Sequence, residues 1–382
     1  MEPSTSELKE TRIASVTACG VSVPLDNPTS FSTRMVAARD YTLVRVLSED
    51  GAEGIGFCYA GSTGGNVVTT AIRELLAPVL VGEDPYRLEG LWQEMYQEAL
   101  LHGRAGSIMR AISALDLALW DRNARVAGLP LYKYLGAFRN GAVPSYASGG
   151  YYLEDKTLHM LAEEMAGYVD LGFAAVKMKV GQLDLPSEEE RVAAVREAIG
   201  SEVLLMLDAN NAFSDLPTAL RFIERVQKYD PYWIEEPFSP DDIENHARLA
   251  ERTPVLVATG EIEAGRWRHR ELLEKRAAAI LQTDAAVCGG ITEFRRIAAI
   301  ADGYGVTISP HWFHDLHVHL VAATPNARLV EYFPDAQVLN FRRLIDNQIE
   351  VRDGALLLPT APGLGFDFDE EAVTTWSYEG WK

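Results

Sequence analysis

The sequence lacks the features that mark several large classes of protein. It has only three cysteines, Cys19, Cys58 and Cys288, in 382 residues, and none belongs to a CxxC pair. This number and spacing exclude a disulfide framework and a zinc site made of thiolates. Residues 1–12 carry no signal-peptide pattern and are expected to form a flexible tail. No apolar run approaches the ~20 residues of a membrane helix, so we expect a cytoplasmic protein.

Positive charge is also scarce, with 35 basic and 55 acidic residues and a net charge of −20. Such a chain repels nucleic acid and anionic lipid, so neither is expected as a partner. Net charge does not decide the charge of one pocket, and anionic small molecules stay among the candidate substrates. The absence of GxGxxG and GxxxxGK[ST] motifs argues against an enzyme that cradles phosphates. The apolar fraction of 47% is typical of a folded globular protein.

The first third of the chain has an α+β pattern. Residues 41–47 and 54–59 alternate as strands around a turn, and residues 26–40 and 61–66 are polar and predicted as loops. Apolar residues then recur at helical spacing, which predicts helices near 68–80, 85–101 and 106–127. Together these elements indicate one α+β unit.

From about residue 143 short β-branched runs alternate with amphipathic helices. The candidate strands are 143–147, 174–180, 203–207, 232–234, 255–258, 279–282, 306–308 and 328–330. The helices between them include 188–198, 217–228, 243–251, 267–275 and 292–302. This alternation predicts a parallel (β/α) barrel in the α/β class. An open doubly wound sheet is the alternative, but eight strands without a nucleotide-binding glycine motif favour closure.

Titratable residues follow the second to eighth strands, at the barrel end where catalytic groups are found. In chain order they are Lys177 with Lys179, Asp208, Glu235, Glu261, Asp284, His311 and Glu331. A salt bridge or a solvated loop explains any one of them. Their recurrence at seven consecutive strand ends is better explained by a shared active site.

Three of these residues have the chemistry of a metal site. Asp208, Glu235 and Glu261 follow neighbouring strands, and converging carboxylates repel one another unless a cation neutralises them. Ligation by oxygen alone, with positions left for substrate, suits Mg²⁺. The neighbouring Glu236 is expected to point to the opposite face of its strand, which argues against a glycosidase pair with Glu235.

Two candidate bases flank this predicted metal site. Lys177 and Lys179 share one face of a strand, and a lowered pKa would let one of them accept a proton. His311 and Asp284 end neighbouring strands, an arrangement in which the carboxylate fixes the imidazole tautomer. Glu331 is expected to hydrogen-bond a substrate carboxylate. The additional histidines His314, His317 and His319 do not share a face with His311, which argues against zinc.

These residues resemble the enolase superfamily, and specifically its mandelate racemase/muconate lactonizing enzyme subgroup. The resemblance covers nearly the whole chain. It is carried by the KMK motif at 177–179, Asp208, the EEP motif at 235–237, the GE motif at 260–261, Asp284 with 289–293, His311, 319–325 and Glu331. Residues 114–121 with 128–130, and 362–365, resemble segments of that family's capping domain.

The resemblance implies a modified TIM barrel, (β/α)₇β, with an α+β capping domain. The expected division is 1–137 plus about 355–382 for the capping domain and 138–354 for the barrel. It also implies Mg²⁺ bound by Asp208, Glu235 and Glu261, and abstraction of the proton α to a carboxylate. A homo-oligomer is a further expectation from the family.

The resemblance also suggests where the substrate binds. Ser148 would contact the substrate carboxylate and Asn210 a substrate hydroxyl. Specificity would come from capping-domain residues in 26–40 and 57–66, among them Arg34 and Tyr59. The polar side chains of these segments favour a hydroxylated substrate over an aromatic one.

The function favoured by this pattern is dehydration of an acid sugar, a hydro-lyase reaction on a small carboxylate. A racemase or epimerase of a 2-hydroxy acid would use the same residues, with Lys179 and His311 on opposite faces of the substrate. A non-catalytic barrel that only binds its ligand is the alternative from another class. The sequence does not separate dehydration from racemisation and does not decide which base removes the proton.

Overall fold

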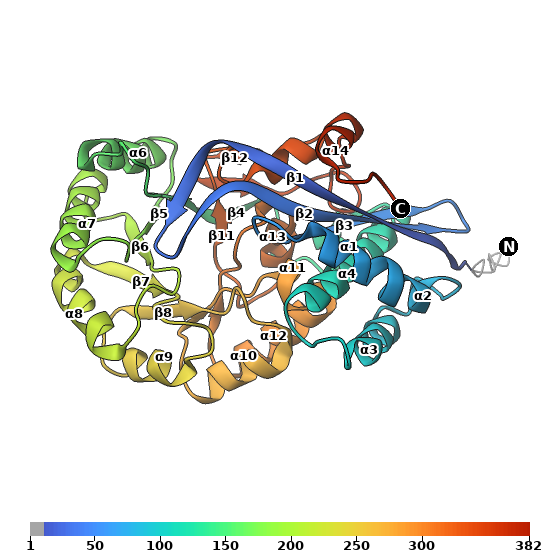
Figure 1. Ribbon diagram of the computed structural model, residues 1–382, viewed down its shortest axis with the longest axis horizontal. Helices are drawn as coiled ribbons and strands as arrows, with labels where there is room; N and C mark the ends of the chain where they lie inside the picture. The colour runs from blue at the N-terminus through green and yellow to red at the C-terminus, as the bar shows by residue number, and fades with distance from the viewer. Residues whose placement is uncertain (1–10) are drawn as a thin grey trace, which may run out of the picture.

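The computed structural model describes residues 11–382, so most of the predicted N-terminal tail lies outside the described residues. Figure 1 shows a barrel ringed by helices on one side and a sheet with helices packed on it on the other. This is the predicted class, an α/β barrel with an α+β unit attached.

The N-terminal unit is an antiparallel sheet of β1 (Ile13–Phe31), β2 (Arg34–Ser48) and β3 (Glu53–Tyr59). Its helices are α1 (Gly65–Thr70), the π-helical η1 (Ala71–Leu76), α2 (Ala77–Leu80), α3 (Leu88–Ala99), α4 (Ser107–Val126) and α5 (Leu131–Tyr134). Helix α4 packs closely on β3 because Gly56 has no side chain. A Cβ placed there would lie 1.9 Å from the Ala114 carbonyl oxygen.

The prediction of a loop over residues 26–40 was wrong. Strands β1 and β2 continue through most of this stretch, with a register shift between Pro24 and Thr29. Polar side chains obscured the strand pattern, but backbone pairing does not depend on them. The hairpin reaches across to the barrel (Figure 1), where the backbones of Ser30 and Tyr152 exchange hydrogen bonds of 2.9 and 3.2 Å. The Ser32 hydroxyl donates to the Ala209 carbonyl at 2.5 Å.

All the predicted barrel strands form. They are β4 (Ala142–Gly149), β5 (Ala175–Lys179), β6 (Leu204–Asp208), β7 (Pro231–Glu235), β8 (Leu256–Thr259), β9 (Ile280–Leu281), β10 (Thr307–Ile308) and β11 (Val330–Tyr332). Neighbours from β4 to β10 pair in chain order, and β11 pairs in parallel with β4. A bridge between Ile308 and Ala327 completes the ring. The open-sheet alternative is therefore excluded.

Helices alternate with these strands along the chain. They are α6 (Leu158–Asp170), α7 (Leu185–Ile199), α8 (Leu216–Val226) with η2 (Gln227–Tyr229), α9 (Ile243–Ala250), α10 (Gly265–Glu274), α11 (Ala285–Cys288), α12 (Gly290–Gly303) and α13 (His314–Ala323). Several begin at a side-chain cap; the Asp215 carboxylate, for example, accepts from the Thr218 amide at 2.7 Å.

The period of two along each strand aims the functional residues inward. On β5, Ala175 belongs to an apolar cluster inside the barrel with Met206 of β6 and Trp233 of β7. Val176, the next residue on β5, packs toward the outer helices instead. Lys177 lies two residues beyond Ala175 and therefore shares its inward face. The apolar cluster forms a floor, and the charged strand ends lie above it.

The C-terminal segment first joins the barrel and then returns to the N-terminal unit. It contains η3 (Asn340–Leu344), β12 (Val351–Arg352), β13 (Ala355–Leu357) and α14 (Glu370–Trp376). Strand β13 pairs antiparallel with β4, so the predicted boundary near 355 falls inside a hairpin attached to the barrel. Beyond it, Gly363 bridges to Pro130 and Ser377 bridges to Val21. The domain division remains a prediction.

A buried carboxylate joins the two units. Asp116 of α4 accepts hydrogen bonds from the Thr292 amide at 2.9 Å and the Thr292 hydroxyl at 2.6 Å. Gly290, at a φ of 89°, lets the chain pass so close that a Cβ would lie 2.3 Å from Asp116 Oδ2. This joint holds the N-terminal unit against the first turn of α12, which follows β9 and α11 in the chain.

Cys19, Cys58 and Cys288 are free and buried. Within residues 11–382, no helix has both the length and the apolar character needed to cross a membrane.

Candidate active site

Two lysines and three carboxylates form a buried network at the barrel rim. Lys177 Nζ lies 2.6 Å from Glu235 Oε1 and 2.7 Å from Glu331 Oε1, and Lys179 Nζ lies 2.5 Å from Asp208 Oδ2. Lys179, Asp208 and Glu235 are lateral neighbours in the strand register, which brings side chains from three separate segments to one level. The sequence predicted this convergence.

The predicted lowering of a lysine pKa beside the bound metal stays a prediction, and ion pairing with the carboxylates alone raises both lysine pKa values. Burial alone would lower the pKa of Lys179, but the Asp208 carboxylate outweighs it and the pKa is raised. Lys177 behaves in the same way, because Glu235 and Glu331 hold its pKa well above the ordinary value. For Lys179 the attraction of Asp208 is larger than the repulsion from Lys177, so ion pairing dominates.

His311 and Asp284 form the predicted pair. Their Nδ1 and Oδ2 atoms are 3.1 Å apart, and His311 Nε2 lies 3.4 Å from Glu261 Oε1. The second oxygen of Asp284 accepts from the Ala286 amide at 2.8 Å, which fixes the carboxylate. Beneath the pair, His317 is fully buried and its Nε2 accepts from the Ala285 amide at 3.1 Å.

The other histidines support the structure around the site. His319 Nδ1 accepts from the Tyr132 amide at 3.2 Å, and its Nε2 lies 3.0 Å from the Leu364 carbonyl. His314 is buried beside Asp315. These contacts agree with the argument against a histidine zinc site.

Glu331 lies on the eighth barrel strand, and its expected contact with a substrate carboxylate stays a prediction. It is 1% exposed, bonds Lys177 through Oε1, and accepts from the Trp312 amide through Oε2 at 2.9 Å. Burial would raise the pKa of Glu331, but the Lys177 ammonium outweighs it and lowers the pKa to about 2. Each oxygen has a partner, so Glu331 holds Lys177 and the Trp312 backbone in position.

The carboxylates fit a hard cation by their chemistry. Glu261 Oε2 is buried and has no hydrogen-bond partner within residues 11–382. Burial, followed by the Glu236, Glu235 and Asp208 carboxyls, raises the pKa of Glu261 well above its ordinary value. As placed, no three acidic, cysteine or histidine side chains of the described chain converge into a metal cage. The lysines engage Asp208 and Glu235 instead, and the metal-ligand assignment remains a prediction.

A pocket of about 330 Å³ lies at this rim, between the barrel and the N-terminal unit. The predicted residues that line it are Lys179, Asn210, Glu261, Asp284, His311, Arg34 and Tyr59. The predicted residues outside its lining are Lys177, Asp208, Glu235, Glu331 and Ser148. Ser148 is fully buried beside Lys177 in the strand register, and its hydroxyl has no partner among the described residues. The pocket thus joins both candidate bases to the capping segments.

The argument that placed Glu236 on the opposite face was wrong. Strand β7 ends at Glu235, and Glu236 adopts a left-handed backbone with a φ of 40°. The alternation of faces therefore stops, and Glu236 lines the same pocket. Burial, then Asp208 and Glu235, raise the pKa of Glu236 to about 8. The proline that follows it in the EEP motif has no N–H to donate to a sheet, which was the available signal that the strand stops here.

Sequence reasoning also missed three further pocket residues, Arg39, Arg110 and Trp312. Trp312 directly follows His311, and their rings stack with centroids 5.5 Å apart. Arg39 lies in the stretch predicted as a loop and Arg110 in the first turn of α4, so nothing local linked either residue to the barrel. The one sequence signal for Arg39 was its position just before the apolar run of β2.

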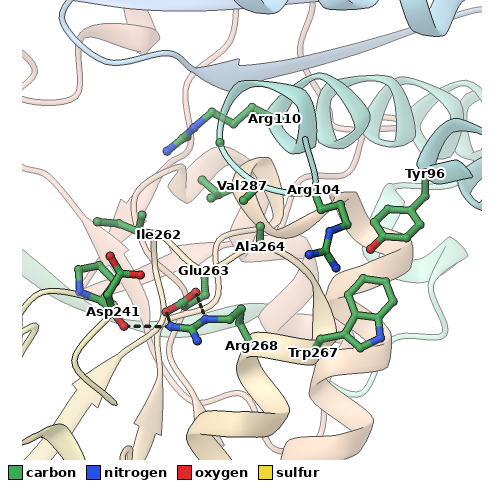
Figure 2. Close-up of a pocket in the computed structure, with 13 residues that line it drawn as sticks. Tyr96, Arg104, Arg110, Asp241, Ile262, Glu263, Ala264, Trp267, Arg268 and Val287 are labelled. Atoms are coloured by element: carbon green, nitrogen blue, oxygen red, sulfur yellow. Dashed lines mark hydrogen bonds and ion pairs between the residues drawn. The ribbon is translucent and has the colours of Figure 1, made fainter. Parts of the chain in front are cut away.

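A larger cavity of about 620 Å³ lies beside the pocket and shares Arg110, Ile262 and Val287 with it. Figure 2 shows that Asp241, Glu263 and Arg268 form their own cluster at its floor. Tyr96 and Trp267 stack on its far side with centroids 4.9 Å apart, near Arg104. None of the candidate bases lines this cavity, so the chemistry belongs to the smaller pocket.

Comparisons with known proteins agree with this arrangement. Residues 13–136 match the model of the mandelate racemase/muconate lactonizing enzyme N-terminal domain, and residues 160–372 match the enolase C-terminal domain-like model. The chain is 36% identical over 361 residues to L-talarate/galactarate dehydratase of Salmonella typhimurium, covering 92% of this chain and 87% of that protein. It is 36% identical over 328 residues to arabinonate dehydratase of Saccharolobus solfataricus, covering 84% and 86%.

A solved structure extends the likeness to the whole fold. A mutant L-talarate/galactarate dehydratase crystallised with Mg and L-glucarate superposes with a TM-score of 0.91 at 32% identity. The superposition covers 100% of this chain and 95% of that chain.

Proposed function

This chain belongs to the mandelate racemase/muconate lactonizing enzyme family of the enolase superfamily, and we propose that it is a Mg²⁺-dependent acid-sugar dehydratase. The observation that carries the proposal is that Lys179 and His311 line one pocket, each held by a carboxylate. Two relatives that are named as dehydratases, each 36% identical to this chain, support the same reaction.

The metal would be held by Asp208, Glu235 and Glu261, whose oxygen donors suit Mg²⁺. When bound, the ion supplies positive charge for the negative charge that develops on the substrate carboxylate. The unpartnered Glu261 oxygen supports this assignment.

The proton transfers are assigned to the two candidate bases. Lys179 or His311 takes the proton from the α-carbon, and the electrons of that C–H bond form a C=C bond to the carboxylate carbon while the carbonyl π electrons move onto a carboxylate oxygen, which gives an enediolate. As these electrons return, a C=C bond forms between the α- and β-carbons, the β C–O bond breaks, and the hydroxyl takes a proton from the imidazolium form of His311 and leaves as water, which gives an enol. Tautomerisation of the enol gives a 2-keto-3-deoxy acid. Asp284 stabilises the imidazolium in this sequence, and Glu331 keeps Lys177 and the Trp312 backbone in place.

Racemisation of a 2-hydroxy acid is the second candidate, because two bases border one pocket. The protein with Mg²⁺ should be incubated with a panel of aldonic and aldaric acids while keto-acid formation is measured. Polarimetry on 2-hydroxy acids should run alongside. Keto-acid formation supports the dehydratase, and loss of rotation without keto acid supports the racemase. Magnesium-dependent turnover of either kind excludes a barrel that only binds, and its absence from both panels overturns the proposal.

The metal assignment has its own test. Chelation with EDTA should abolish turnover, and added Mg²⁺ should restore it. Asp208→Asn should weaken Mg²⁺ binding at least tenfold in titration calorimetry. Asp26→Asn is the matched control, since Asp26 is a surface carboxylate paired with Arg343. Equal Mg²⁺ affinity in the wild type and the Asp208 variant would remove this residue from the metal site.

A further inference from the structure

The capping side of the pocket carries positive charge that the protein does not neutralise. We call the pocket-lining residues Arg34, Arg39 and Arg110 the capping wall. Within residues 11–382, none of the three forms an ion pair with a carboxylate. Arg39 and Arg110 donate to the hydroxyl and the carbonyl of Tyr59, and Arg34 lies over the Phe31 ring. The strand-end lysines and His311 across the pocket each have such a partner. The chain has an excess of acidic residues, so this lack of partners is not a consequence of composition.

Arg39 is the most deeply buried member of the capping wall, with 3% of its surface exposed. Its Nη1 donates to the Tyr59 hydroxyl at 3.1 Å. Its Nε and Nη2 atoms are buried and have no hydrogen-bond partner in the described chain. The guanidinium carbon lies 4.5 Å from the centroid of the Trp312 ring and 5.6 Å from that of the Tyr59 ring.

This environment compensates the charge only in part. Aromatic faces attract a cation, but this attraction is weaker than the hydration that the guanidinium loses when it is buried. An arginine keeps its charge in proteins, so it cannot escape the cost by losing a proton. A buried polar group without partners calls for an explanation, and a pocket beside it supplies one in the form of an anionic ligand.

The position of Arg39 relative to the reacting groups narrows the choice of anion. Trp312 stacks on His311 and also carries the Arg39 guanidinium on its ring face, so the cation is one indole away from the candidate base. The carboxylate beside the reacting carbon is assigned to the three predicted metal ligands, and Arg39 forms no ion pair with any of them in the described chain. An anion at Arg39 is therefore a second charged group on the same substrate.

Resting on the proposed dehydratase function, we propose that Arg39 binds a second carboxylate at the far end of the substrate. The enzyme then selects aldaric acids, which are sugar diacids, over the aldonic acids of the same configuration. Guanidinium and carboxylate match in charge and planar geometry, and the two unpartnered nitrogens of Arg39 add donors that a neutral hydroxymethyl end would use less well.

The test compares acids that differ only at the far end. In the wild type, kcat/KM is measured for two pairs of acids, galactarate with galactonate and glucarate with gluconate. For the pair with the higher turnover, kcat/KM for the diacid should be at least tenfold that for the monoacid. Arg39→Gln should lower kcat/KM for the diacid at least tenfold and for the monoacid less than threefold. Arg39→Lys should recover part of the diacid preference. If Arg39 had a purely structural role, Arg39→Gln would lower kcat/KM for the diacid and the monoacid by the same factor. That result overturns the proposal.

Two controls make the outcome decisive. Arg104→Gln removes an exposed arginine from the neighbouring cavity in Figure 2 and should leave both kcat/KM values within twofold. Binding of galactarate and galactonate to Lys179→Ala with Mg²⁺, measured by calorimetry, tests Arg39 without turnover. If no sugar acid is dehydrated, the proposed function fails, while the binding preference still decides the role of Arg39. Equal affinity for diacid and monoacid in that variant rejects the role.

Discussion

The two sides of the active-site pocket balance their charges differently. We call the strand-end residues Lys177, Lys179, Asp284, His311 and Glu331 the barrel wall; Lys179, Asp284 and His311 line the pocket, and the other two lie outside its lining. Each of these five side chains has an opposite partner within 3.1 Å. On the capping wall the arginines have none among the described residues. Paired groups are fixed in position, which suits proton transfer. Unpaired cations are available to a ligand, which suits recognition. We infer that the barrel wall performs the chemistry and the capping wall chooses the substrate.

The largest expected effect comes from removing a base of the barrel wall. Lys179→Ala and His311→Ala should each lower kcat for dehydration by about 10²–10⁴-fold, as expected for loss of a general acid or base. Keto-acid formation and exchange of the α-proton in D₂O measure this. His159→Ala, at a surface histidine whose side chain is 81% exposed, should change activity less than twofold. Near wild-type proton exchange in both active-site variants would reject the assignment.

The next effect is on stability and tests whether the barrel wall depends on pairing. Lys177→Met would leave Glu235 and Glu331 buried without their cation, and should lower the free energy of unfolding by about 3–5 kcal/mol. Lys228→Met, which breaks a surface ion pair with Glu189, should change it by less than about 0.5 kcal/mol. Denaturant titration of both variants is the measurement. Similar losses of unfolding free energy in the two variants would mean that the burial of an ion pair does not determine how much its cation stabilises the protein.

A smaller effect concerns the joint that sets one wall over the other. Burial raises the pKa of Asp116 to about 7, despite hydrogen bonds from Thr292 that lower it. The unfolded chain ionises near its ordinary value of 3.8, so between these values the folded protein binds an extra proton. Stability contributed by Asp116 is therefore present at low pH and is lost as pH rises through about 7.

Asp116→Asn has no such titration and isolates the effect. The stability of the wild type relative to the variant should fall by up to about 3 kcal/mol between pH 5 and pH 8, since the loss spans about two pKa units of about 1.4 kcal/mol each. Melting temperatures of both proteins across this range are the measurement, and groups that titrate in both cancel in the difference. A constant or growing advantage of the wild type with pH would contradict the raised pKa.

The smallest effect is expected on the exposed edge of the capping wall. Arg34 lines the pocket but is exposed, so Arg34→Gln should raise KM about tenfold or less and leave kcat nearly unchanged. Steady-state kinetics at low and high salt check this, because salt screens an exposed charge and should shrink the difference. A fall in kcat comparable to that of the base variants would erase the proposed division between the two walls.

Much of the barrel wall could be predicted because its signals are local. Each functional residue directly follows an apolar run of strand length, and the period of two then fixes which face it shares. This is why the Lys179–Asp208 and Asp284–His311 pairs were anticipated, and why the predicted strands agree with β4 to β11. The direction of the lysine pKa was not predictable, since it depends on which neighbouring charge lies closest.

The capping wall could not be found in the same way. Arg39 reaches the pocket only because β1 and β2 extend as a hairpin over the barrel, and its polar stretch gave no periodic signal for a strand. Arg110 reaches it only because α4 packs against β3. The position of Glu236 depends on one left-handed backbone angle at a strand end.

The sequence alone determined the alternation of strands and helices, the barrel, the residues that end its strands and their resemblance to one enzyme family. These follow from apolar spacing and from residue types at fixed points of a repeating unit, which are properties of short segments. Tertiary structure decided which ions pair, which oxygen stays unpartnered and which arginines face the pocket. Those outcomes depend on distances and burial between segments far apart in the chain, and the strength of a charge interaction is set by these two quantities.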